Sequence, residues 1–128
     1  MKIKKNDKIF VAGHNGLVGS SICRILKKKG FKKIITVDKK KLNLLNQTKV
    51  FKFLKKINAK FVFIAAAKVG GILTNNTLRG QFIHENLVIQ NNLIHGSYLA
   101  GVKDLIFLGS NCVYPKNCHQ PIKEEYLL

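Results

Sequence analysis

Short apolar runs alternate with segments of helical periodicity along this chain. The runs at 9–12, 34–37, 61–64 and 105–108 are almost unbroken by polar residues, which is typical of strands buried on both faces of a sheet. Between them, apolar residues recur three and four positions apart, and this spacing predicts helices over 17–29, from Asn46 to about 57, and over about 79–100. The alternation predicts an α/β fold with a parallel sheet covered on both faces.

The longest predicted helix carries apolar residues that we expect to face the core. They are Phe82, Ile83, Leu87, Leu93, Ile94 and Tyr98. The glycine-containing segment before this helix, residues 68–76, is expected to be a loop. The last segment, 112–128, contains two prolines and little periodicity, so we expect a loop with at most the start of a helix.

Three glycines spaced three apart follow the first apolar run. Gly13 can make a tight turn after the strand, while Gly16 and Gly19 allow a pyrophosphate and the next helix to come close. The first amides of that helix have no partners within it, and they attract anions. The predicted cofactor-binding turn consists of Gly13, His14, Asn15, Gly16, Leu17, Val18 and Gly19.

A glycine turn after the first strand predicts a Rossmann-type parallel sheet. Right-handed crossovers and the position of the glycines predict the strand order 3-2-1-4. The residues after the fourth strand are too few to complete a doubly wound sheet. We therefore expect residues 1–128 to form one NAD(P)-binding domain that is incomplete, without the later strands or a substrate domain.

Composition and charge limit the possible partners. No apolar stretch approaches the ~20 residues of a membrane span, and the three cysteines lack metal-type spacing, so we expect a cytoplasmic protein with neither a metal nor a membrane partner. The net charge of +17 raises the alternative of nucleic-acid binding. However, 21 of the 23 basic residues are lysines, which are less suited than arginine to bidentate recognition of bases and phosphates, so nucleic acid is the less favoured partner.

The end of the second strand leaves the choice of cofactor open. Asp38 stands where an acidic residue can accept hydrogen bonds from the adenosine ribose, which favours NAD. Lys39, Lys40 and Lys41 follow at once and could neutralise the extra phosphate of NADP.

Two further motifs lie beyond the glycine turn. One is the string Ala-Ala-Ala-Lys-Val-Gly-Gly-Ile at 65–72, with Asn-Asn-Thr at 75–77. The other is Phe-Leu-Gly-Ser-Asn-Cys-Val-Tyr-Pro-Lys at 107–116. Together with the turn, they resemble the extended short-chain dehydrogenase/reductases, and within them the GDP-L-fucose synthase group of NADP-dependent epimerase/reductases. The resemblance covers nearly all of this chain but only the N-terminal part of such enzymes.

The resemblance implies roles for residues after the fourth strand. Ser110 is similar to the serine that hydrogen-bonds the reacting ketone, and Cys112 resembles the cysteine that exchanges protons with the sugar. Leu108, Gly109, Ser110 and Asn111 would pass along the nicotinamide side of NADP. A GDP-sugar substrate is implied only if a C-terminal part completes the protein, and the long helix resembles one used in homodimer contacts.

One expected feature is missing from the sequence. The family protonates its substrate with a tyrosine that has a lysine four residues later, on the same helical face. Here Tyr98 is followed at that distance by Val102 and Tyr114 by Cys118. We therefore expect little or no reductase activity from this chain alone, and a free-standing dinucleotide-binding module remains an alternative.

Overall fold

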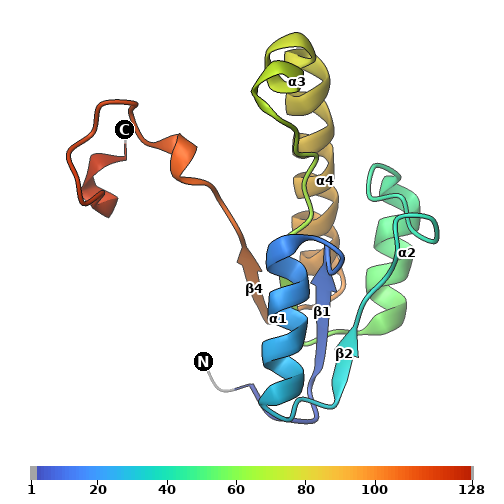
Figure 1. The fold of residues 1–128 in the computed structure, drawn as a ribbon. Helices are drawn as coiled ribbons and strands as arrows, with labels where there is room; N and C mark the ends of the chain where they lie inside the picture. The colour runs from blue at the N-terminus through green and yellow to red at the C-terminus, as the bar shows by residue number, and fades with distance from the viewer. Residues whose placement is uncertain (1–2, 128) are drawn as a thin grey trace.

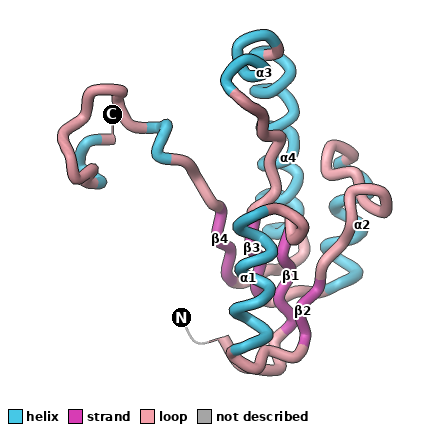
Figure 2. Tube along the Cα trace, in the orientation of Figure 1, coloured by secondary structure: helices cyan, strands magenta, loops and turns pink. Residues whose placement is uncertain are grey.

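Four parallel strands and their covering helices make up the computed structural model, which describes residues 3–127 (Figures 1 and 2). The ends of the predicted domain 1–128, residues 1–2 and 128, lie outside the described part. In chain order the elements are β1 (Lys8–Ala12), α1 (Leu17–Lys28), β2 (Lys33–Ile35), α2 (Gln47–Ile57), β3 (Phe61–Ile64), α3 (Ile72–Thr77), α4 (Arg79–Leu99), β4 (Asp104–Phe107), and the 3₁₀ turns η1 (Asn111–Val113) and η2 (Glu124–Tyr126). The predicted α/β fold with a parallel sheet is confirmed.

The order of the strands differs from the predicted 3-2-1-4. The observed order is β2-β1-β3-β4, so β1 pairs with both β2 and β3. The reason is the placement of the helices: α1 packs on one face of the sheet, whereas α2 and α4 pack on the other. Right-handed crossovers on opposite faces of a sheet step along it in opposite directions. The connection through α1 therefore leads from β1 to β2, and the connection through α2, on the other face, leads back past β1 to β3.

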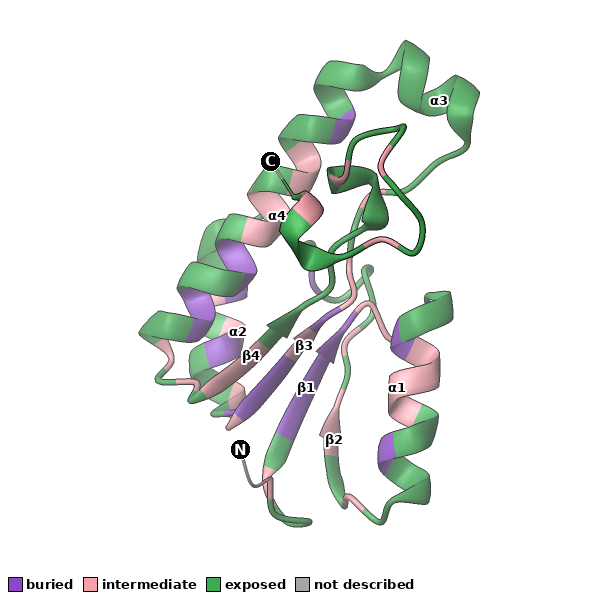
Figure 3. Ribbon diagram, turned by 90° about the vertical axis from the view of Figure 1, so that its left-hand side faces the viewer, coloured by how far each residue is buried: buried purple, intermediate pink, exposed green. Residues whose placement is uncertain are grey.

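The strands bury alternate residues into two cores, one on each face of the sheet. Phe10 and Val62 face α2 and α4, where Leu54 and Leu93 are buried with them. On the other face, Ile9 packs with the α1 residues, and the central strands β1 and β3 are buried along most of their length (Figure 3). The apolar runs are therefore nearly continuous because both sides of each strand are covered.

Only part of the apolar surface of α4 faces the core. Phe82 and Leu93 are buried as predicted, but the other four residues in the predicted inward set are exposed: Ile83, Leu87, Ile94 and Tyr98. The buried stripe instead includes Asn92, Gly96 and Ser97. At Gly96 an added Cβ would lie 2.8 Å from side-chain atoms of Leu54 and Phe51. Gly96 therefore lets α2 approach α4 closely, because it has no side chain at this contact.

Of the two segments predicted as loops, one contains a helix, and the other, 112–128, is loop with short 3₁₀ turns over its described part. The expected loop at 68–76 contains the short helix α3. After β4 the chain leaves the edge of the sheet (Figure 1). Within the described part of this tail, residues 109–127, the hydrogen bonds join its own residues to one another. No helix among residues 3–127 is sufficiently long and apolar to span a membrane.

Candidate functional site

The glycine turn has no room for a side chain at two of its three glycines, Gly13 and Gly19. Gly13 has a φ of +85°, and a Cβ there would lie 2.5 Å from the carbonyl oxygen of Ala65. A Cβ on Gly19 would lie 2.1 Å from the carbonyl oxygen of Gly13. Gly16 is the N-cap of α1, and no side chain in the described residues caps this helix. The first amides of α1 therefore remain available to an anion.

The turn borders a cavity of about 650 Å³ at the carboxyl ends of the strands. This volume is typical of small-molecule sites, and ligands of open parallel sheets bind at this edge. The turn residues Gly13 to Val18 line it, together with Lys39. A further group of residues that were not assigned from the sequence also lines the cavity: Leu42, Asn43, Leu44, Leu45, Ala65, Ala66, Ala67, Lys68, Val69, Glu85 and Ile89. For the residues that follow β2 and β3, this position was the available signal, since parallel strands end at one edge. Glu85 and Ile89 lie on α4 and carried no such signal.

Two walls of this cavity are fixed by side chains of α4. The Asn86 side chain accepts from the Lys68 backbone amide at 2.7 Å and donates to the Lys68 carbonyl at 3.0 Å. Buried Asn92 donates to the carbonyl of Leu44 at 2.8 Å, on the opposite wall. These bonds satisfy polar groups in largely apolar surroundings. They also attach the loop after β2 and the loop after β3 to the same helix, α4.

An ion pair lies on the same wall as Asn86. Lys68 Nζ donates to Glu85 Oε1 at 2.7 Å, and Gln81 donates to the same oxygen at 2.9 Å. The hydrogen bond from Lys68 is the main cause that holds the pKa of Glu85 below its usual value. Glu85 is therefore ionised at neutral pH, and its charge is balanced by Lys68.

Asp38 is held by the glycine turn at the end of β2. Asn15 Nδ2 donates to Asp38 Oδ1 at 3.0 Å, and His14 Nε2 lies 3.5 Å from the same oxygen. Lys39 lines the cavity, whereas Lys40 and Lys41 are exposed and, among the residues described, lie outside its lining. The structure therefore brings only the first of the three lysines to the cavity.

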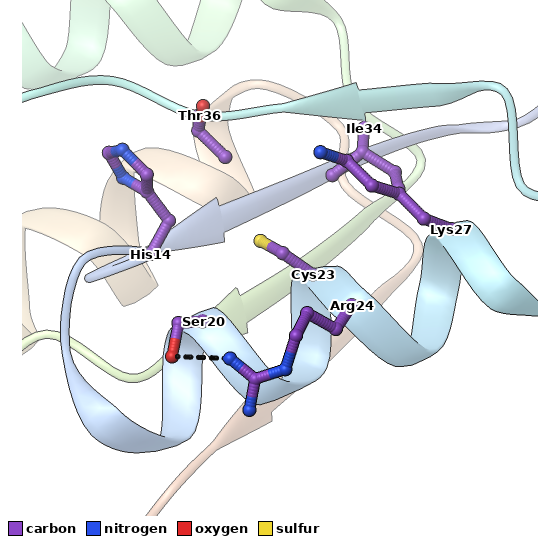
Figure 4. A pocket seen from close by; sticks show the side chains of 7 residues that line it. All are labelled: His14, Ser20, Cys23, Arg24, Lys27, Ile34 and Thr36. Atoms are coloured by element: carbon purple, nitrogen blue, oxygen red, sulfur yellow. Dashed lines mark hydrogen bonds between the residues drawn. The ribbon is translucent and has the colours of Figure 1, made fainter.

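A second, smaller hollow of about 280 Å³ lies between α1 and β2 (Figure 4). It is lined by His14, Ser20, Cys23, Arg24, Lys27, Ile34 and Thr36. Burial raises the pKa of the Cys23 thiol, so this cysteine is a poor nucleophile. Arg24 donates to the hydroxyls of Ser20 and Ser21 on the same helix, and the bond to Ser20 is drawn in Figure 4. His14 lines both cavities.

The predicted catalytic residues lie on the segment that follows β4. The Cys112 amide donates to Ser110 Oγ at 3.2 Å, and Cys112 Sγ lies 3.8 Å from Asn111 Oδ1. Leu108, Gly109, Ser110, Asn111 and Cys112 are all exposed and do not line either cavity described here. They begin at the same edge of the sheet as the glycine turn. Their catalytic and cofactor-binding roles stay predictions.

Known proteins resemble this chain over nearly its full length. The sequence model of the NAD dependent epimerase/dehydratase family matches residues 9–128. GDP-L-fucose synthase of Sinorhizobium fredii is 48% identical over all of this chain and 40% of its own length. GDP-L-fucose synthase 1 of Arabidopsis thaliana is 51% identical over 97% of this chain and 38% of its own length.

A solved structure shares the fold closely. GDP-mannoheptose C4 reductase of Campylobacter jejuni, solved with NADP bound, superposes with a TM-score of 0.93 at 43% identity. The superposition covers 98% of this chain and 40% of that one. The chain thus spans about 40% of the length of the relatives that it matches.

Proposed function

Because this chain belongs to the NAD dependent epimerase/dehydratase family, we propose that it is the cofactor-binding N-terminal part of an NADP-dependent epimerase/reductase. The proposed whole enzyme converts GDP-4-keto-6-deoxy-D-mannose to GDP-L-fucose in the cytoplasm, as a possible homodimer. The observation that carries the proposal is the glycine turn, whose uncapped amides border a cavity large enough for a dinucleotide. Similarity to two GDP-L-fucose synthases supports the choice of reaction.

The residues at the cavity fit NADP. The turn from Gly13 to Val18 would hold the pyrophosphate at the amino end of α1, and Lys39 would face the extra phosphate. The loops Leu42–Leu45 and Ala65–Val69 would pack against the ring systems, since they line the cavity with mostly apolar side chains. NADPH, when bound, supplies the hydride that reduces a ketone.

Ser110 and Cys112 would act on the sugar of the substrate. The hydroxyl of Ser110 donates a hydrogen bond to the ketone oxygen, which stabilises the negative charge that develops there. That ketone acidifies the neighbouring C–H bonds, so a base supplied by the rest of the enzyme would remove a proton from one face of such a carbon to give an enolate. The Cys112 thiol would then donate a proton to the opposite face, which inverts the configuration and leaves a thiolate that regains its proton from the removed one or from water. The exposure of both side chains leaves them accessible to a substrate.

Cofactor binding by this chain is the first test. We expect NADPH fluorescence to rise on titration with the protein. The Lys39→Met variant should bind NADPH about tenfold more weakly because one charged contact is lost.

Lys40→Met is the matched control, since Lys40 lies outside the cavity lining, and it should bind like the original chain. If the chain binds no dinucleotide, the proposal is wrong. Retention on DNA that falls with salt and is not competed by NADPH would instead support nucleic-acid binding.

A free-standing dinucleotide-binding module is the second candidate function. It is favoured by the position of Ser110 and Cys112, which do not line the larger cavity. Such a module would bind NADPH without any chemistry at Cys112.

A chimera separates the two candidates. Residues 1–128 would replace the matching part of the Sinorhizobium fredii relative, and turnover of GDP-4-keto-6-deoxy-D-mannose would be measured. We expect the chimera to be active, its Cys112→Ala variant to lose epimerisation by a hundredfold or more, and a Cys118→Ala control to stay active. A well-folded chimera that binds NADPH but has no activity would favour the binding module.

A further inference from the structure

The end of β2 presents two opposite charges to the place where a dinucleotide would bind. Asp38 can accept hydrogen bonds from the hydroxyls of an adenosine ribose, and its charge repels a phosphate on that ribose. Lys39 has the opposite preference because an ammonium group attracts the phosphate. The cofactor preference of this chain therefore depends on which of the two side chains faces the ligand.

The structure separates these two side chains. Lys39 lines the larger cavity, whereas Asp38 does not belong to its lining. Asp38 instead turns toward the glycine turn, where Asn15 Nδ2 donates to Oδ1 at 3.0 Å. His14 Nε2 approaches the same oxygen at 3.5 Å. One carboxylate oxygen thus has two partners, both on the turn between β1 and α1.

Asn15 is the partner that can hold the carboxylate in any charge state of the histidine. Its amide is a permanent donor, whereas the His14 ring nitrogen donates only in one tautomer or when protonated. The side chain of Asp38 remains about half exposed, at 54%, so loss of this bond would leave it room to rotate toward the cavity.

We propose that Asn15 determines the cofactor preference by holding the Asp38 carboxylate against the glycine turn, which leaves Lys39 to face the extra phosphate of NADP. The inference rests on the proposed function, since it concerns the same dinucleotide site. Asn15 is a specificity-determining residue here because it acts on the ligand through Asp38.

A double-mutant cycle with binding as its readout tests the proposal. The dissociation constants of NADPH and NADH are measured by fluorescence titration for the original chain, Asn15→Leu, Asp38→Asn and the double variant. Freeing the carboxylate in Asn15→Leu should lower the NADPH preference, the ratio of the two constants, about tenfold. Asp38→Asn should maintain or raise this preference. In the Asp38→Asn background, the change at Asn15 should no longer alter the ratio, because no charge remains to be held.

Two further variants keep the result interpretable. Asn15→Ala also removes the donor and adds no charge to the cavity lining, so it should shift the ratio in the same direction if Asn15→Leu fails to fold. Asn91→Leu makes the same chemical change on the exposed surface of α4 and should leave both constants unchanged.

The outcomes separate this inference from the proposed function. If the original chain binds neither dinucleotide, the proposed function is wrong and this inference with it. If it binds NADPH but both Asn15 variants keep the original ratio, only the role of Asn15 is overturned. A shift of equal size with and without the Asp38→Asn change would also overturn it, because Asn15 would then act independently of Asp38.

Discussion

Lys68 and Glu85 form an ion pair of 2.7 Å that ties the segment after β3 to α4. The pair is partly buried, and the Lys68 ammonium also lies 5.2 Å from the centre of the Phe82 ring. Together with the two hydrogen bonds between Asn86 and the Lys68 backbone, it fixes one wall of the larger cavity. The stability of this wall should therefore depend on the charge of Glu85.

This dependence predicts a specific response to acid. The pKa of Glu85 is lower in the folded chain than its ordinary value, chiefly because Lys68 donates to it. Its contribution to stability is therefore present above about pH 4.3, the usual glutamate value, and is lost as the pH falls through the lowered folded pKa. Glu85→Gln should reduce the free energy of unfolding at pH 7, and this difference should shrink in acid. Urea unfolding at several pH values measures both effects.

Glu125→Gln provides the matched control. Its partner Lys123 lies 3.8 Å away, and both side chains are more than half exposed, so this substitution should have little effect at any pH. Equal losses of stability in Glu85→Gln at pH 7 and pH 3 would contradict the assigned role of the charge. Asp7, whose pKa is lowered by the Lys4 amide and by Lys60, should add to the acid sensitivity of both variants.

The glycines of the turn should separate folding from binding. In Gly19→Ala the new methyl group would lie 2.1 Å from the Gly13 carbonyl oxygen, so the backbone must shift, at a cost of about 1–3 kcal/mol or more. In Gly16→Ala the nearest atom is 3.4 Å away, an ordinary contact, but the methyl group would stand at the cavity. We expect Gly16→Ala to melt normally and to bind NADPH at least tenfold more weakly. Thermal melts with NADPH titrations test this contrast.

Gly96 should be required for the packing of α2 against α4. An alanine Cβ there would meet side-chain atoms of Leu54 and Phe51 at 2.8 Å, and such overpacking costs about 1–3 kcal/mol. Gly80 lies on the same helix with no atom within 4 Å of an added Cβ, so Gly80→Ala should be neutral or stabilising by up to about 1 kcal/mol. Denaturant unfolding of the two variants compares them directly. If they were equally stable, the close helix contact would be unimportant.

The cysteines should differ in reactivity toward a thiol reagent. Cys112 is exposed, whereas burial raises the pKa of Cys23 and so reduces its thiolate fraction. We expect iodoacetamide to modify Cys112 many times faster than Cys23 at pH 7.5, as followed by peptide mass spectrometry. Faster modification of Cys23 would contradict its partly buried position on α1.

Much of the local structure could be predicted from the sequence. The apolar run over 61–64 coincides with β3, and the Asn46 side chain caps α2 by accepting from the Lys49 amide at 2.9 Å. The glycine turn was also recognisable because its three glycines follow a buried strand at a fixed spacing. These features can be predicted because they are local. They depend on how apolar side chains recur along one helix or strand and on the backbone conformations that single residues can adopt.

Other features were decided only by tertiary structure. The strand order depended on which face of the sheet α2 covers, and the buried stripe of α4 depended on what packs against it, so apolar Ile83 and Tyr98 are exposed while polar Asn92 is buried. The contact between Asn15 and Asp38 joins residues that are 23 positions apart. Sequence periodicity describes the faces of each element, but the partner of each face is determined only when all the elements pack together, because burial is a property of the assembled fold.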